Sequence, residues 1–100
     1  MTDDFPPTLP EAYAEIEKAL RGHEDQSEDF IRALARRIDA VIAQVQLFPE
    51  SGAAYLFGTR RLLLRPLPYQ LIYTIQDGVV RIIAFAHTSQ EPAYWADRLN

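Results

Sequence analysis

The sequence predicts an α+β fold in which an antiparallel helical hairpin packs on an antiparallel β-sheet of three or four strands, followed by a short C-terminal helix or tail. Two segments in the first half carry apolar residues at helical spacing, and two segments in the second half are β-type runs. The dipeptide Asp77-Gly78 between those runs is a strong signal for a tight hairpin turn. We expect residues 1–100 to form a single domain, because a chain of this length leaves no room for a second core.

The first predicted helix follows an acidic, proline-rich lead-in formed by residues 1–7. Thr8 and Glu11 have the spacing of a capping box, in which the two side chains satisfy free amides at a helix start. Apolar residues then recur at helical spacing up to Leu20, and Gly22 is the expected stop. Because proline lacks a backbone donor, any β-strand in the lead-in should be short or lie at a sheet edge.

The second predicted helix starts after an N-cap that is either Asp25 or Ser27. Its apolar stripe ends near Leu47 and comprises Phe30, Ile31, Leu34, Ala35, Ile38, Val41, Ile42 and Val45. The segment 48–52 then breaks the helix with a proline and a glycine. Because the polar connector between the helices is short, the two should run antiparallel, and such a pair needs another layer to close a core.

The second half of the chain predicts the sheet. Residues 53–59 are expected to form a loop with apolar anchors, and residues 60–67 a strand that ends at prolines. Residues 69–76 alternate more cleanly, and a further strand follows the turn. One face of this sheet should receive the helices, whereas the other face should stay open, more polar and flanked by the tail.

The length of the hairpin loop decides which side chains share a face. A two-residue loop pairs Gln76 with Val79 and sends Ile83 and Phe85 away from the core. A three-residue loop, residues 76–78, pairs Ile75 with Val79 and places both side chains in the core. We favour the three-residue loop, because exposing a Phe and an Ile forfeits several kcal/mol of burial.

Composition and charge limit the function classes. The chain has no cysteine, two histidines and no glycine loop of the phosphate-binding kind, so neither a metal site nor a cofactor is expected. Residues 1–50 carry eleven acids and five bases, a balance of −6, while residues 51–100 carry three acids and five bases, a balance of +2. Direct nucleic-acid binding is therefore not expected. The sequence shows no signal peptide and no membrane span, which indicates a cytoplasmic location.

Several motifs of the chain together resemble the ParE/RelE toxin superfamily of bacterial type II toxin–antitoxin systems. Residues 47–52, LFPESG, look like the "L..FPE.G" that closes the second helix in ParE-type chains. Arg61-Leu62 and residues 68–73, PYQLIY, look like "RRL…PYRIVY". The closing "vrIl.v.H…P.YW..R" is similar to residues 80–87 followed by Pro92, Tyr94, Trp95 and Arg98. The resemblance covers roughly residues 30–100 and implies the α+β fold predicted above.

The chain departs from the family pattern at places that matter for chemistry. In RelE-type members, cations on the open sheet face and a tail tyrosine cleave messenger RNA on the ribosome. The corresponding positions here hold Arg61, Leu63, Gln70, Thr88 and Tyr94, and the leucine, glutamine and threonine cannot supply the missing cations. Thr88, Ser89 and Gln90 also follow the histidine where basic residues are usual, and prolines occupy the usual first strand. If the protein were an endoribonuclease, Arg61 and Tyr94 would be its catalytic residues.

The resemblance to ParE-type members implies a different activity, which we predict for this chain. These proteins poison DNA gyrase by binding, without chemistry of their own, and a cognate ParD-like antitoxin holds them inactive. A degenerate, non-toxic member that only binds its antitoxin is the remaining alternative.

Seven residues are expected to contact the target or partner: Arg61, Arg65, Arg81, His87, Tyr94, Trp95 and Arg98. His87 could instead be a structural histidine at a strand end, and Tyr94 and Trp95 could form a lid over the core. Each arginine could equally be an ordinary solvated group.

Overall fold

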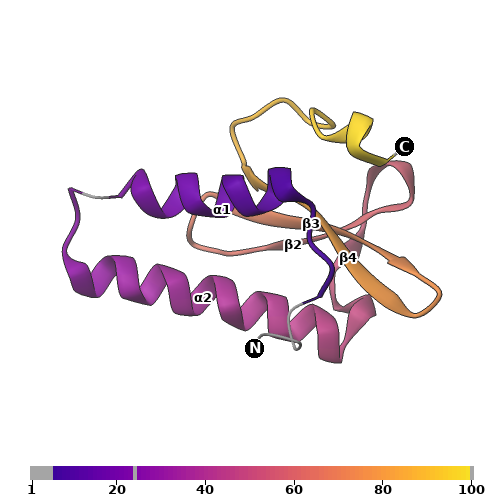
Figure 1. Cartoon of the computed structure of the whole chain (residues 1–100), viewed down its shortest axis with the longest axis horizontal. Coiled ribbons are helices and arrows are strands. Elements are labelled where there is room, and N and C mark those ends of the chain that lie inside the picture. Colours follow the sequence, from indigo (N-terminus) through magenta and orange to yellow (C-terminus); the bar gives the residue numbers. More distant parts are fainter. Residues whose placement is uncertain (1–5, 24, 100) are drawn as a thin grey trace.

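The computed structural model describes residues 6–23 and 25–99 and confirms the predicted α+β fold (Figure 1). Two α-helices run side by side in opposite directions and are followed by a sheet in the order β1-β2-β3-β4, with neighbouring strands antiparallel. The elements are α1 (Pro10–Arg21), α2 (Glu28–Leu47), β1 (Ala53–Ala54), β2 (Arg60–Leu63), β3 (Tyr69–Gln76) and β4 (Val79–His87). Short 3-10 turns lie at η1 (Pro49–Ser51), η2 (Leu56–Gly58) and η3 (Ala96–Leu99). None of the helices in the described residues is long and apolar enough to cross a membrane.

The start of α2 confirms one predicted cap, and the start of α1 shows that another was wrong. The hydroxyl of Ser27 accepts a hydrogen bond from the Phe30 amide at 3.1 Å. The residue before α1, however, is Leu9, whose side chain makes no cap bond, and the Thr8 hydroxyl donates to the Pro6 carbonyl at 2.9 Å. The capping box fails because α1 begins one residue later, at Pro10, whose missing amide is one fewer donor to satisfy.

The lead-in pairs with the edge of the sheet through an isolated β-bridge. The Ile82 amide donates to the Pro7 carbonyl at 2.8 Å, and the Leu9 amide donates to the Ile82 carbonyl at 3.1 Å. These two bonds make a single parallel bridge between Thr8 and Ile82 on the outer edge of β4. Pro7 and Pro10 have no amide to donate, which limits the pairing to this bridge and agrees with the expectation of a short edge strand. Residues 1–5 of the predicted lead-in lie outside the described residues.

The sheet has one strand more than the three predicted segments. Residues 53–59 are not a simple loop, because Ala53 and Ala54 pair with Arg61 and Arg60 before the chain turns through η2. Strand β2 is shorter than the predicted 60–67, since the Leu64 amide already bonds the Tyr69 carbonyl across the turn at 3.0 Å.

The β3–β4 hairpin has a two-residue loop, so the favoured three-residue loop is wrong. Gln76 pairs with Val79, and Asp77 and Gly78 have φ values of 52° and 78°. Positive φ at both central residues is the type I′ turn, whose twist matches that of the flanking strands. Asp77-Gly78 therefore forms the turn by itself.

A β-bulge in β4 reverses which face of the sheet the side chains beyond it occupy, compared with a regular strand after a two-residue loop. Tyr73 pairs with Ile82, but the next pair is Ile72 with Ala84, so β4 has one extra residue, Ile83. Beyond the bulge, Phe85 lies opposite Leu71, in the core as predicted. At the bulge, the predicted core position of Ile83 is wrong. Ile82 lies in the helix-facing core instead, and Ile83 lies on the other face of the sheet.

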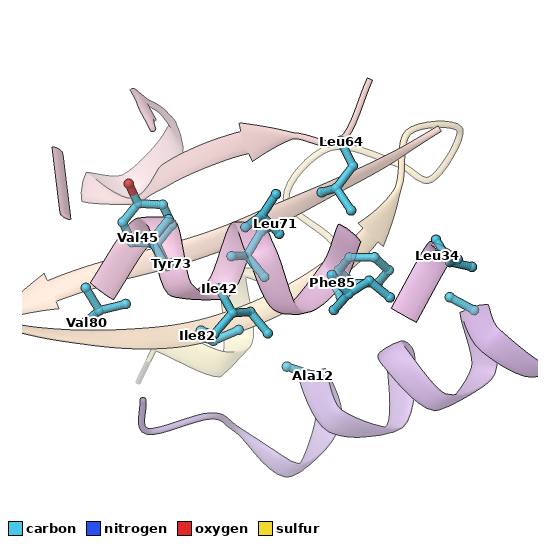
Figure 2. Packing of buried hydrophobic residues seen from close by; sticks show 13 residues of the cluster. Ala12, Leu34, Ile42, Val45, Leu64, Leu71, Tyr73, Val80, Ile82 and Phe85 are labelled. Atoms are coloured by element: carbon cyan, nitrogen blue, oxygen red, sulfur yellow. The ribbon is translucent and has the colours of Figure 1, made fainter. Parts of the chain in front are cut away.

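The helix-facing side of the sheet holds the larger core (Figure 2). Ile42 and Val45 of α2 lie against Leu71, Tyr73 and Phe85 of the strands (Figure 2). Ala12 and Ala19 bring α1 close to the same face, and α1 also contacts β4. This cluster positions both helices on one face of the sheet.

The other face of the sheet is not open, which corrects the prediction. Ile72, Ile83 and Ala84 pack there against Trp95 of the C-terminal segment, and Trp95 is only 1% exposed. The extra apolar residue at the bulge gives this face something to bury, and the tail supplies the cover. The molecule therefore has three layers: two helices, the sheet and the C-terminal segment.

The LFPESG segment is attached to the sheet through one buried tyrosine. The Tyr73 hydroxyl donates to the Pro49 carbonyl at 2.6 Å and accepts from the Gly52 amide at 2.9 Å. A Cβ atom at Gly52 would lie 2.6 Å from that hydroxyl oxygen, so only glycine permits this approach. The spacing between the helix-closing motif and the PYQLIY strand thus has a direct structural reason.

Candidate partner-binding surfaces

The C-terminal segment is fastened to the fold by a cluster that we call the tail clamp, made of Glu15, Tyr94 and Arg98. The Arg98 guanidinium forms two parallel bonds to the Glu15 carboxylate, Nη1 to Oε1 and Nη2 to Oε2, each 3.0 Å long. The Tyr94 hydroxyl donates to Glu15 Oε2 at 2.6 Å, and Arg98 Nη1 also donates to the Ile83 carbonyl at 3.1 Å. The clamp thus joins α1, β4 and the tail.

Burial makes the tail clamp stronger than a surface ion pair. The side chains of Arg98 and Glu15 are 17% and 19% exposed, and a bidentate arrangement is the strongest geometry of this pair. Burial, followed by the hydrogen bond to Glu15, raises the pKa of Tyr94 above its usual range. The hydrogen bond to Glu15 likewise raises the pKa of Arg98. At neutral pH the phenol of Tyr94 is therefore protonated and acts as a donor.

Trp95, one of the predicted partner contacts, is the residue of the tail whose side chain is buried against the sheet. Its ring approaches those of Tyr55 and Phe57, with centroids 6.1 Å and 6.3 Å away. Tyr94, Trp95 and Arg98 are thus brought together, as the sequence analysis expected, but they hold the tail down rather than point outward. This is the lid that the sequence analysis kept as its alternative for Tyr94 and Trp95.

The other three predicted arginines lie in β2, just after β2 and in β4. The Arg61 guanidinium lies 4.4 Å from the centroid of the Tyr55 ring and donates to the Gln70 side chain at 3.4 Å. Arg65 is exposed and Arg81 is half-buried, and neither side chain has a hydrogen bond or ion pair within the described part of the chain. Within the described residues, no hydrogen bond or ion pair joins these three side chains to the tail clamp.

His87 lies at the end of β4 beside aromatic rings. It meets Tyr69 edge to face with centroids 5.3 Å apart, and Tyr69 stacks on Phe85 with centroids 5.1 Å apart. An open cavity of about 420 Å³ borders these rings and the second half of α1. Within the described residues, no hydrogen bond or ring contact joins His87 to the arginines that were predicted to contact the same target or partner.

Exposed apolar side chains gather where α2 ends and the β3–β4 hairpin turns. Leu47, Phe48 and Val79, which we call the α2-end patch, are 73%, 66% and 50% exposed. A groove of about 460 Å³ is bordered by residues 47–51, Ile75 and Gly78, the last of which precedes Val79 in the chain. Contiguous exposed apolar groups of this kind indicate a protein contact. The sequence analysis missed this surface, although the apolar pair directly before the helix-breaking proline was visible.

Glu15 is the residue of the tail clamp that the sequence analysis missed. It is three residues after Ala12 and four before Ala19, so it shares the buried stripe of α1 with two small residues. A carboxylate in such a stripe needs a buried partner, which the tail supplies. The signal was therefore present, but nothing in the sequence indicated that the partner was Arg98.

Comparison with known proteins gives one clear result. The family model for the ParE toxin of type II toxin–antitoxin system, parDE, matches residues 9–92, from the start of α1 to the tail. No curated protein matches the chain at a significant level. The matched range contains both helices, all four strands, the LFPESG segment and Glu15. The chain therefore belongs to the ParE toxin family of type II toxin–antitoxin systems, and its partner in such a system is an antitoxin.

Proposed function

We propose that this protein is a toxin that stops growth by binding DNA gyrase, without a catalytic step of its own, and that a ParD-like antitoxin neutralises it. Membership of the ParE family supports the proposal, because it assigns the chain to a type II system. The observation that carries the non-enzymatic part is the tail clamp. It engages Tyr94, the tail tyrosine that a nuclease of the RelE kind would need free.

A nuclease of the RelE kind needs a group that moves a proton and cations that stabilise the developing charge. The Tyr94 hydroxyl already donates to Glu15, and its raised pKa disfavours the phenolate that would act as a base. The charge of Arg98 is neutralised by the same carboxylate. These bonds argue against ribonuclease chemistry at the tail, together with the uncharged Gln70 and Thr88.

A binding toxin needs surfaces, and the α2-end patch offers one. Its three side chains present apolar area beside a groove, which suits the apolar face of a partner segment. Because these side chains are largely exposed, a partner could cover them without rearrangement of the fold.

The proposal is tested by inducible expression and by assays with purified protein. Expression should arrest growth, and the protein should inhibit supercoiling by gyrase while leaving ribosome-bound messenger RNA intact. Co-expression of the antitoxin encoded beside the gene should restore growth. Cleavage of messenger RNA would overturn the proposal in favour of an endoribonuclease. Binding of the antitoxin with neither growth arrest nor gyrase inhibition would indicate a degenerate member.

A further inference from the structure

The cavity between α1 and the end of the sheet has a lining that selects for one kind of ligand. Its volume is about 420 Å³, and aromatic rings from Tyr69, Phe85 and His87 form one side. The remaining lining comes from α1 and from the chain just after β4, namely Glu15, Lys18, Ala19, Gly22 and Gln90.

The carboxylate of Glu15 has no acceptor capacity left. Its Oε1 accepts from the Phe85 amide and from Arg98, and its Oε2 accepts from Tyr94 and from Arg98. Four donors fill the roughly four lone-pair directions of a carboxylate. Its negative charge is also matched by the guanidinium of Arg98. Glu15 therefore neither needs a donor from a ligand nor strongly repels an anion.

Several other acceptors near the cavity are engaged. The Tyr69 hydroxyl lies 3.3 Å from Nε2 of His23. In the last turn of α1, the Gly22 amide donates to the Lys18 carbonyl at 2.8 Å, and the His23 amide donates to the Leu20 carbonyl at 3.4 Å. The end of α1 thus offers the cavity few free acceptors.

The imidazole of His87 is left with a donor. The Ser89 amide lies 3.1 Å from Nδ1, and an amide can only donate, so Nδ1 carries no proton in the neutral ring. The Ser89 hydroxyl bonds the same nitrogen at 2.7 Å. The ring proton therefore sits on Nε2, and within the described residues no group accepts from it.

Lys18 and Gln90 add further donors. The Gln90 side-chain oxygen accepts from the His87 amide at 2.9 Å, which leaves its NH₂ group unused. Lys18 is the one lysine of the chain, is exposed on α1 and has no ion pair within residues 6–23 and 25–99. Apart from the Tyr69 hydroxyl, which can donate or accept, the free side-chain groups of the cavity are an ammonium, an amide NH₂ and an imidazole N–H, all of them donors.

We infer that this cavity binds a carboxylate whose carrier places an apolar or planar group against Tyr69 and Phe85. The ammonium of Lys18 supplies charge, the two neutral donors supply direction, and the stacked rings supply apolar contact. The occupant to which we assign it is an acidic side chain, flanked by an apolar one, on the antitoxin segment that covers the toxin. This choice of source rests on the proposed function, whereas the preference for a carboxylate does not.

The preference for a carboxylate can be measured with two small probes of nearly equal shape, benzoate and benzamide. Each is titrated into the full-length protein, and amide chemical shifts are followed by NMR. Benzoate should shift the resonances of Lys18, His87 and Gln90 saturably, with an affinity at least ten-fold higher than that of benzamide. Equal affinities, or benzoate shifts centred on Arg36 and Arg37, would overturn the inference.

Matched variants on α1 separate the cavity from general charge. Lys18→Met should lower the benzoate affinity at least five-fold and leave benzamide binding unchanged. Arg21→Met removes the same charge one turn further along the helix, on a residue that does not line the cavity, and should leave both unchanged. A similar benzoate loss in both variants would refute a localised site.

A second measurement tests the source of the carboxylate. Lys18→Met should weaken binding of the cognate antitoxin at least five-fold while the effect on gyrase is unchanged. If benzoate binds as expected but the antitoxin affinity does not move, the assignment to the antitoxin is wrong. If the benzoate test fails, the inference falls and the proposed function stands. If the unmodified protein does not inhibit gyrase, the proposed function falls and the preference for a carboxylate stands.

Discussion

Replacing Glu15 by glutamine should release the C-terminal segment from the sheet. Glutamine keeps the size of the side chain but presents an NH₂ group where Glu15 has an oxygen. That NH₂ would face a donor from Tyr94, Arg98 or the Phe85 amide, whichever way the amide is turned. The guanidinium of Arg98 would also lose its counter-charge in a site where it is 17% exposed.

The size of the effect follows from the burial of the pair. Removing one partner of a fully buried ion pair costs about 3–5 kcal/mol, whereas an exposed pair contributes about 0–1 kcal/mol. Because Glu15 and Arg98 are mostly but not fully buried, we expect a loss of about 2–4 kcal/mol in the free energy of unfolding. For a domain of this size, that corresponds to a melting temperature lower by about 10–20 °C.

Trp95 is the one tryptophan of the chain and belongs to the segment that the clamp holds against the sheet, so its fluorescence reports on the tail. In urea titrations of Glu15→Gln, the Trp95 signal should change at a lower urea concentration than the far-UV circular dichroism. The two transitions separate because the tail opens before the helices and sheet unfold.

Glu17→Gln is the matched control. Glu17 is also on α1, but it is 71% exposed and lies 4.0 Å from Arg21, so its loss should cost less than about 0.5 kcal/mol. The reasoning is refuted if Glu15→Gln is as stable as this control and its Trp95 emission is unchanged. A double-mutant cycle with Arg98→Met should then also give no coupling energy.

Three further predictions concern other parts of the molecule. Tyr73→Phe leaves the buried Gly52 amide without an acceptor and should cost about 2–3 kcal/mol in urea denaturation, whereas Tyr55→Phe should be nearly neutral. The pKa of Tyr94 is higher in the folded state than in the unfolded state, so its neutral phenol stabilises the fold fully below about pH 10 and less as the pH rises further. In thermal melts at alkaline pH, Tyr94→Phe should therefore lose less stability than the unmodified protein. Phe48→Asp, at a position 66% exposed, should leave the melting temperature within a few degrees but weaken antitoxin or gyrase binding at least ten-fold, and unchanged binding to both would exclude the α2-end patch.

Local sequence patterns predicted the helices well because the relevant information is local. The apolar stripe that ends near Leu47 and the Ser27 cap depend on residues within one or two turns. The strand 69–76 was predicted with its observed bounds for the same reason, since alternation and a flanking turn define it. The fold class followed from these elements and their order.

The parts that could not be predicted depend on residues far apart in the chain. The bulge at Ile83 becomes favourable only because Trp95 covers the second face of the sheet, twelve positions later. Glu15 and Arg98 meet across eighty-three positions. No pattern within a short window contains either contact, so the prediction of an open second face was incorrect.

The bulge at Ile83 also bears on how this hairpin can vary among related chains. Turn length and strand length here compensate each other, since a turn one residue longer would restore the same facing of Phe85 if β4 lost its extra residue. An insertion near Asp77-Gly78 and a deletion near Ile83 should thus be harmful singly and tolerated together. Relatives aligned by their turns would then show an apparent one-residue gap in β4 although their cores superimpose.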